Sequence, residues 1–323
     1  MYDACHYLMV PMHYAFYNND VKTIKLFADF FSRFVNDVTG DDLYQFQQGG
    51  TLNKLHFFYL CTQYMNLSAT HGYDSHIPNA LPALAQNFAE NYLLHTRANW
   101  GTEQTVITHM QCVINGKVYD ANYKSAIEDL DQFTLAILCD LKYLYLVRRE
   151  SYAPVLDTAA DLAYQIFSSP TLNQETEKGG WLFQPGCWSD HPDYAYAGNP
   201  TIFEGIEPLI RADVPWDSSH FHRFPLFLNS WQSAQPNKER QALFQLRKEQ
   251  LANQMAEYVL QNIDGRWLTT TFMDGTNGVY RYSYNTEGVG LDGYDLSGTF
   301  LFGWWAFLHN EHIAQCYRDI LKT

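Results

Sequence analysis

Apolar residues recur every three or four positions along much of the chain, which is the spacing of one buried face of an α-helix. In residues 22–38 this spacing places Ile24, Phe27, Phe31 and Val35 on a single stripe. Similar patterns predict helices over residues 52–66, 81–95, 127–150, 152–167, 238–262, 296–308 and 310–321, in the N-terminal segment and from about Pro225. The pattern therefore predicts a mainly α fold with about ten helices.

Two segments have the pattern of a β-hairpin instead. Residues 106–120 carry Asn115-Gly116, the strongest two-residue hairpin signal. Residues 265–284 contain two Asx-Gly pairs, Asp274-Gly275 and Asn277-Gly278, as the expected turn. The return strand of this second hairpin would place Tyr280, Tyr282 and Tyr284 on one face, either as a packing ridge or as a stacking platform.

The order of these elements suggests how the chain is organised. No Gly-, Ser- or Pro-rich linker interrupts residues 1–323, so we expect a single domain. Long loops at residues 97–125, 168–224 and 263–295 separate the helical hairpins. This alternation predicts an (α/α) toroid of helical hairpins, with one or two β-hairpins among long loops that gather at one end of a central cavity. An irregular helical bundle is the alternative.

Composition narrows the classes of partner. The formal net charge is −14, and no basic run is present, so we expect no nucleic-acid partner. No apolar run reaches about 18 residues, so we expect no membrane span. The absence of a leader pattern makes a cytoplasmic location the default, or a secreted or periplasmic one if a signal peptide has been removed. The six cysteines are scattered without CxxC spacing, which favours buried thiols over a zinc site.

Aromatic residues make up 16% of the chain, and many lie beside ionisable residues in the long loops. Residues 179–200 combine two Trp, two Asp, one His and two Tyr, and residues 216–225 combine Asp, two His and Arg. If Pro225 starts a helix, the second cluster precedes a helix N-terminus, which favours anionic ligand groups. The predicted hairpin at residues 265–284 supplies a third cluster with Asp274, Arg281 and its tyrosines.

A helical toroid with aromatic loops carrying Asp, His, Tyr and Arg resembles the (α/α) toroid enzymes that act on carbohydrates, the glycoside hydrolases and polysaccharide lyases. The resemblance covers the whole chain as architecture, and no single family's signature aligns with these positions. It implies a carbohydrate substrate, bound by rings that stack on the apolar sugar face. The roles of individual residues are therefore assigned from their chemistry.

Hydrolysis requires one protonated and one ionised carboxyl group, about 6.5–9.5 Å apart in the inverting geometry. Asp190 or Asp193 paired with Asp217 could supply them. Elimination beside a uronate requires a Tyr or His base and a group that neutralises the carboxylate, which Tyr194, His220 and Arg223 could supply. The acidic chain disfavours polyanionic substrates, so a glycoside hydrolase is the leading hypothesis and a lyase the alternative.

The candidate catalytic residues are Asp190, Asp193, Asp217, His220 and Arg223, and the candidate substrate-binding residues are Trp181, Trp188, Tyr194, Tyr196, His222, Arg281 and Tyr282. Asp190 and Asp217 could instead serve only as turn caps. His220 and His222 form an HxH pair that could bind a metal. In an extended segment such residues point the same way without an ion, so we expect no metal and no cofactor. A non-catalytic carbohydrate-binding protein and a helical interaction protein remain alternatives from other classes.

Overall fold

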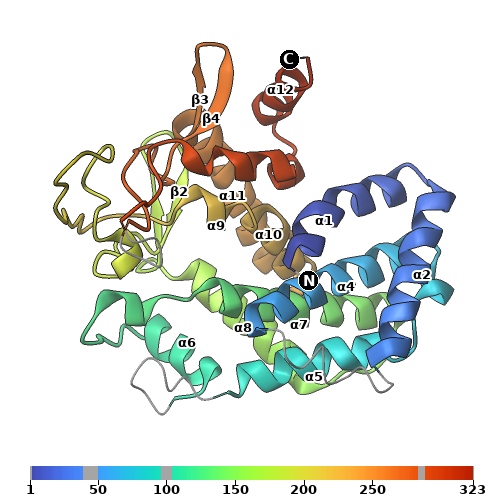
Figure 1. The fold of residues 1–323 in the computed structure, drawn as a ribbon. Coiled ribbons are helices and arrows are strands. Elements are labelled where there is room, and N and C mark those ends of the chain that lie inside the picture. The colour runs from blue at the N-terminus through green and yellow to red at the C-terminus, as the bar shows by residue number, and fades with distance from the viewer. Residues whose placement is uncertain (1, 39–49, 96–103, 283–287, 323) are drawn as a thin grey trace. The chain divides into compact units, whose positions relative to one another are not determined.

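The structure is a computed structural model that describes residues 2–38, 50–95, 104–282 and 288–322 (Figure 1). Within these residues α-helices dominate, and the only paired strands form two short antiparallel hairpins. The chain divides into two compact units, which are described separately. The first unit comprises Met1–Thr108, Glu128–Tyr164 and Asn229–Lys238, and the second comprises His109–Ile127, Gln165–Leu228 and Glu239–Thr323.

The first unit is built of helices around a central pair. It contains α1 (Tyr2–Tyr17), α2 (Val21–Val38), α4 (Thr51–Thr70), η1 (Asp74–His76), α5 (Leu81–Leu93), α7 (Asp129–Arg148), most of α8 (Pro154–Ser168) and the C-terminal part of α10 (Phe224–Ser233). Helix α4 packs against α1, α5 and α7. Both α4 and α7 are buried on nearly all sides, as expected for helices at the centre of a core.

Local sequence explains these helices, and the predicted ones in this unit are confirmed. The stripe of Ile24, Phe27, Phe31 and Val35 is the buried face of α2. Pro82 lies in the first turn of α5, where a missing N–H costs no hydrogen bond. At the start of α7, the Asp131 carboxylate accepts a 3.1 Å hydrogen bond from the backbone N–H of Glu128. Each signal depends only on neighbouring residues, which is why the sequence predicts it well.

The second unit is less regular and holds all of the described strands. It contains most of α6 (Val106–Ile114), η3 (Asn122–Ser125), β1 (Asn173–Glu175), β2 (Trp181–Phe183), η4 (Pro192–Tyr194), α9 (Ser218–Phe221), the start of α10, α11 (Lys238–Gln254), the π-helical turn η5 (Met255–Val259), β3 (Leu260–Ile263), β4 (Arg266–Thr269), η6 (Asp295–Phe302), η7 (Trp304–Leu308) and α12 (Glu311–Ile320). Strand β1 pairs with β2, and β3 pairs with β4.

The predicted hairpin at residues 106–120 is wrong, because this segment begins with helix α6. The apolar residues Val106, Met110 and Val113 are buried at helical spacing, and this pattern outweighs the Asn-Gly signal. Gly116, at φ +77°, instead ends the helix. Its N–H bonds to the Val113 carbonyl and that of Lys117 to the Cys112 carbonyl, which is the Schellman arrangement.

The second predicted hairpin is displaced towards the N-terminus. The observed turn is Asp264-Gly265, between β3 and β4, and both residues have positive φ as a type I′ turn requires. Residues 274–278 form a turn without paired strands, and Tyr280 makes only an isolated bridge to Leu291. Ser283 and Tyr284 lie outside the described residues, so the row of three tyrosines is seen only as Tyr280 and Tyr282.

Two predicted helices are also corrected. The helix expected over residues 238–262 ends at Gln254, and the chain passes through the π-helical turn into β3. The α-helix expected over residues 296–308 is instead two 3₁₀ segments, η6 and η7, joined at Gly303 with φ +81°. A left-handed residue cannot continue a right-handed helix, so the chain turns there.

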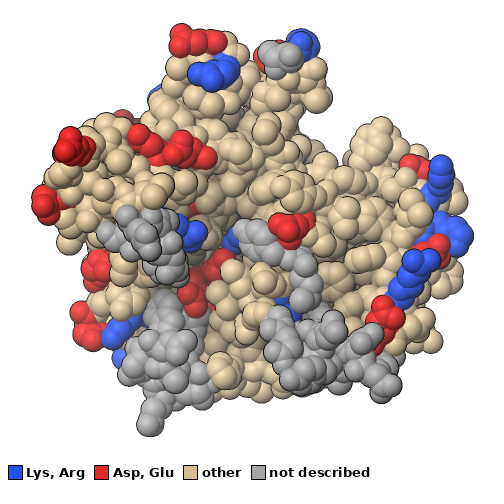
Figure 2. All heavy atoms as spheres, viewed as in Figure 1, with Lys and Arg blue, Asp and Glu red and all other residues tan. Residues whose placement is uncertain are grey.

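Surface charge and thiols complete the description. No described helix is both long and apolar enough to cross a bilayer. On the face shown in Figure 2, the described Lys and Arg residues are scattered among Asp and Glu over a mostly uncharged surface, without a continuous basic stripe. All six cysteines are free thiols; Cys112 is partly exposed and the other five are buried.

Candidate functional site

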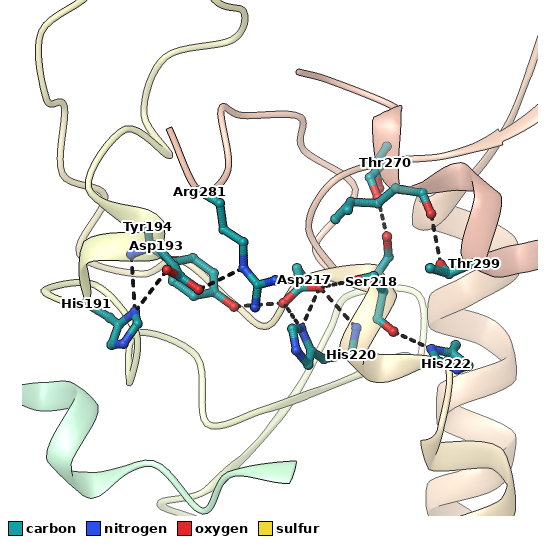
Figure 3. A network of polar contacts seen from close by, with 12 residues as sticks. His191, Asp193, Tyr194, Asp217, Ser218, His220, His222, Thr270, Arg281 and Thr299 are labelled. Atoms are coloured by element: carbon teal, nitrogen blue, oxygen red, sulfur yellow. Dashed lines mark hydrogen bonds and ion pairs between the residues drawn. The ribbon is translucent and has the colours of Figure 1, made fainter. Parts of the chain in front are cut away.

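A single turn of helix, α9, holds the centre of the candidate site (Figure 3). Asp217 caps this turn, because its Oδ1 accepts a 3.0 Å hydrogen bond from the backbone N–H of His220. Ser218 fixes the same turn from the other side: its N–H donates to the Thr271 carbonyl at 2.9 Å, and its hydroxyl donates to the Thr270 carbonyl at 2.8 Å. The backbone that carries Asp217 and His220 is therefore tied to the neighbouring segment.

The ring of His220 is oriented by the Asp217 carboxylate. Its Nδ1 lies 2.8 Å from Oδ2 and 3.0 Å from Oδ1 of Asp217. Because an ionised carboxylate only accepts, the proton of a neutral His220 is on Nδ1, and Nε2 carries the lone pair. The other ring nitrogen, Nε2, has no hydrogen-bond partner among the described residues, and the side chain is 22% exposed. His220 thus presents a basic nitrogen with access to solvent.

Two hydroxyl groups complete the surroundings of the Asp217 carboxylate. Tyr194 donates to Oδ2 at 2.9 Å, and the Ser219 hydroxyl donates to Oδ1. Burial by itself raises the pKa of Asp217, but the charge and ring hydrogen bond of His220, the Ser219 hydroxyl and the His220 backbone N–H outweigh it and hold that pKa well below its ordinary value. Asp217 is therefore an ionised acceptor at neutral pH and a poor proton donor.

A second ion pair, between Asp193 and Arg281, lies beside the first in Figure 3. Arg281 Nε donates to Asp193 Oδ2 at 2.9 Å, and the Arg281 backbone N–H donates to the Asp193 carbonyl at 2.8 Å. Burial disfavours the charged guanidinium, but Tyr280, Asp193 and Asp217 outweigh it and raise the pKa of Arg281. The backbone of Arg281 is left-handed, with φ +59°, and such unfavourable conformations cluster at functional sites.

The ring of His191 forms a hydrogen bond with the backbone of Asp193 in the same loop. Its Nδ1 accepts a 3.2 Å hydrogen bond from the Asp193 backbone N–H, which requires that nitrogen to be unprotonated. Burial lowers the pKa of His191, which agrees with this neutral state. The ring also packs edge-on against Trp188 and Tyr123 at 5.3 Å between centroids. His191 therefore acts here as a positioning group for the loop.

The structure corrects the expected exposure of three aromatic residues. Trp181 is fully buried, and its indole N–H donates to Asn173 Oδ1 at 2.9 Å. Trp188 and Tyr194 are also buried and stack at 5.9 Å between centroids, almost parallel. These rings pack against aromatic residues of other segments, such as Phe224 for Trp181 and Phe272 for Tyr194, so they are not open to a ligand. Tyr196 and Tyr282, by contrast, are partly exposed and lie 4.7 Å apart.

The Asp190 carboxylate accepts hydrogen bonds from two backbone N–H groups of another segment. Its Oδ2 accepts from the Asn122 N–H at 2.7 Å and its Oδ1 from the Tyr123 N–H at 3.0 Å, at the start of η3. The alternative that Asp190 serves only as a turn cap fits these contacts, although the capped turn belongs to a distant segment. Asp217 also caps a turn, but its second oxygen holds the His220 ring. Capping and site chemistry are therefore not exclusive at Asp217.

His222 and Arg223 lie in the interior of the second unit. His222 Nδ1 is hydrogen-bonded to the Ser219 carbonyl, and its ring packs against Trp304. Arg223 is 2% exposed. The expected extended segment is in fact helical at residues 218–221, so His220 and His222 take different partners and do not point the same way. Across the described residues, no group of three or more His, Cys, Asp or Glu side chains is arranged to hold a metal ion.

The network also contains residues that the sequence does not predict as part of the site, among them Ser219 and His191. A cap residue followed by Ser and His at the next positions, as in Asp217-Ser218-Ser219-His220, is a local signal that could have identified Ser219. The contact between His191 and Asp193 depends on the 3₁₀ turn η4, which the sequence does not predict.

Comparisons with known proteins do not identify a relative. No protein-family model matches the chain, and neither the curated proteins nor the solved structures contain a significant match. The function has to be inferred from the site itself.

Proposed function

We propose that this chain is an acid–base enzyme acting on carbohydrate, in which His220 transfers a proton. The observation that carries the proposal is the Asp217–His220 pair, in which a buried carboxylate holds Nδ1 at 2.8 Å while the ring is 22% exposed. A carboxylate partner fixes the tautomer of a histidine and stabilises the imidazolium that forms when its ring takes up a proton. This arrangement is better suited to proton transfer than to packing.

The carbohydrate assignment is supported by partly exposed side chains in the loops that carry Asp193 and Arg281. Tyr196 and Tyr282 offer partly exposed rings of the kind on which a pyranose stacks. Arg281 has a side chain that is 38% exposed and so offers a positive charge to an anionic group. A sugar that carries a carboxylate would use both features. We therefore take a uronate-containing glycan as the preferred substrate class.

The same geometry favours elimination over hydrolysis. In elimination, His220 Nε2 takes the proton from the carbon next to the uronate carboxylate, and the electron pair forms a carbon–carbon double bond. The glycosidic carbon–oxygen bond breaks, and the leaving oxygen takes up a proton from the imidazolium or from water. Arg281 would stabilise the negative charge that develops on the carboxylate. No carboxyl group of the enzyme has to be protonated.

Hydrolysis is the second candidate, and Asp193 is the carboxyl group that could serve it. A hydrolase requires one protonated carboxyl group, and Asp217, with its lowered pKa, does not suit that role. Asp193 Oδ1 is buried and has no hydrogen-bond partner among the described residues. In a hydrolase, a substrate hydroxyl or leaving oxygen would have to contact that oxygen, since the other carboxyl oxygen is held by Arg281. A purely binding protein would not need an oriented histidine base.

The toroid and the single domain are part of the same proposal. In this proposal the helices form the hairpins of an (α/α) toroid, and the irregular segments of the second unit carry the site. A crystal structure of the whole chain tests this, since it fixes how the two units are arranged. Two independently placed domains would contradict the toroid.

The activity test compares two readouts on the same substrates. Purified protein is incubated with alginate, pectate and hyaluronan and, separately, with neutral glucans and mannans. We expect ultraviolet absorbance from unsaturated uronates together with new reducing ends. Reducing ends without absorbance would favour the hydrolase, and neither signal on any polymer would reject the enzyme. His220→Ala should abolish the signal, whereas His312→Ala, at an exposed histidine of α12, is the matched control.

A further inference from the structure

A separate cavity lies wholly within the first unit. Its volume is about 230 Å³, and it is open to solvent. Helices α1, α4 and α7 and the C-terminal part of α10 line it with residues His13, Gln63, Asn66, Leu67, Thr70, Asp140, Tyr143, Asn229, Ser230 and Ser233. None of these residues belongs to the site around His220, which lies in the second unit. The proposed activity therefore does not account for this cavity.

The wall of the cavity combines apolar surface, including Leu67 and Tyr143, with polar side chains that form a connected network. Asp140 Oδ2 accepts from Thr62 Oγ1 at 2.8 Å and from Gln63 Nε2 at 2.7 Å. The same Gln63 Nε2 lies 3.1 Å from Ser230 Oγ, and Gln63 Oε1 lies 3.0 Å from His13 Nε2. A buried hydrogen-bonded network of this kind is unusual between packed helices, where apolar contacts are the rule. It holds the polar side chains of the wall in fixed positions beside the apolar part.

One polar atom of the wall has no protein partner. Asn66 Oδ1 is buried and has no hydrogen-bond partner among the described residues. A buried acceptor without a partner destabilises the folded chain, so binding of a donor there is favourable. The atom is thus an acceptor available to a hydroxyl or amino group of a ligand.

The charges of the wall favour an uncharged ligand. Among the lining residues there is no Lys or Arg. Burial, reinforced by His71 and opposed by the Gln63 hydrogen bond, lowers the pKa of His13 to about 4, so its ring is neutral. Burial also raises the pKa of Asp140 to about 7, against the hydrogen bonds of Gln63, Ser230, Thr62 and Asn66. The Asp140 carboxylate would repel an anion. A cation would be attracted only weakly, because that carboxyl is only partly ionised near neutral pH.

Taken together, we infer that this cavity is a binding site for a small uncharged polyhydroxyl compound, such as a monosaccharide or polyol. The volume of about 230 Å³ equals that of about eight waters at ~30 Å³ each, which suits one small organic molecule. Hydroxyl groups both donate and accept, so one of them can pair with Asn66 Oδ1, while the carbon skeleton of the compound suits the apolar part of the wall. Water alone would fill the same space without any selectivity.

The binding test uses the full chain and named probes. Saturation-transfer NMR and calorimetry are recorded with glycerol, myo-inositol and D-glucose, and with ethylammonium and acetate as charged probes of similar or smaller size. We expect at least one uncharged probe to bind, and both charged probes to bind at least tenfold more weakly. Preferred binding of ethylammonium, or no binding of any uncharged probe at 100 mM, would overturn the proposal.

Variants locate the binding and separate it from the site around His220. Asn66→Ala removes the unpartnered acceptor and should weaken binding at least tenfold, whereas Asn91→Ala, on the exposed face of α5, is the matched control. Asp140→Asn should weaken binding as well, and Asn66→Ala keeps the test valid if that variant does not fold. Binding should persist in His220→Ala. If instead it is lost there and kept in Asn66→Ala, the probe occupies the second unit and the cavity proposal fails.

Discussion

The carboxylate of Asp217 is hydrogen-bonded to two separate groups of His220, to the backbone N–H through Oδ1 and to the ring Nδ1, nearest through Oδ2. One residue therefore fixes both the start of the α9 turn and the orientation of the ring. An ordinary helix cap leaves the following side chains free to rotate. Here the cap also selects the tautomer of the histidine, so the local fold and the chemistry depend on the same carboxylate.

Removing either partner should lower turnover strongly. We expect His220→Ala and Asp217→Asn each to reduce kcat/KM by at least ~100-fold, the lower end of what a positioned acid or base contributes. The measurement is steady-state kinetics on the substrate found in the polymer screen, with His312→Ala expected within about twofold of wild type. Folded forms of both variants that keep wild-type turnover would remove this pair from the mechanism.

Asp217 should also make the protein sensitive to acid. Its pKa is lower in the folded chain than in the unfolded chain, so its contribution is fully present above the unfolded pKa and is lost as pH falls through the folded one. Urea unfolding of wild type and Asp217→Asn at pH 6 and pH 3 measures this. We expect wild type to lose more free energy of unfolding between these two pH values than the variant does. An equal loss in both proteins would contradict the lowered pKa.

Asp140 should have the opposite effect on stability. Burial raises its pKa to about 7, so between pH 4 and pH 7 the folded chain binds more protons than the unfolded chain. The free energy of unfolding therefore falls as pH rises through this window, by an amount on the order of a few kcal/mol at most. Asp140→Asn should flatten the dependence between pH 4 and pH 7. A variant with the slope of wild type would show that Asp140 titrates normally.

Asp190 should affect stability and not turnover. Its carboxylate caps the backbone N–H groups of Asn122 and Tyr123, and losing such a cap costs about 1 kcal/mol. We expect Asp190→Ala to lower the free energy of unfolding by about that amount, with kcat/KM within about twofold of wild type. A loss of turnover near that of His220→Ala, without loss of stability, would return Asp190 to the catalytic group.

Local signals explain where the sequence predicted the fold correctly. The helices with a clear apolar stripe, such as α2, and those with a marked first turn, such as α5, follow from a few neighbouring residues. The prediction at Asn115-Gly116 is wrong because this dipeptide occurs both in hairpin turns and at helix C-termini. The burial of Val106 and Met110 by the rest of the fold selects the helix. The displaced hairpin has the same cause, since several Asx-Gly pairs compete in residues 264–278.

The candidate site was predictable to the extent that it lies in one short segment. Asp217 and His220 are three residues apart, so the sequence could propose them together. The contact of Tyr194 with Asp217, and that of Arg281 with Asp193, join residues far apart in the chain. Composition also could not distinguish the buried Trp188 from the partly exposed Tyr196, because both occur in the same loop. Which aromatic ring faces solvent depends on tertiary packing.

The rate at which the free thiols react with a reagent can measure how fast the chain unfolds. Five of the six cysteines are buried, and only Cys112 is partly exposed. Burial raises the pKa of Cys61, Cys139 and Cys187, which lowers the thiolate fraction on which alkylation depends. A maleimide should therefore label one position quickly and the rest only as fast as the chain unfolds. The mass of the labelled protein against time would then report, for every variant above, how often its interior becomes accessible.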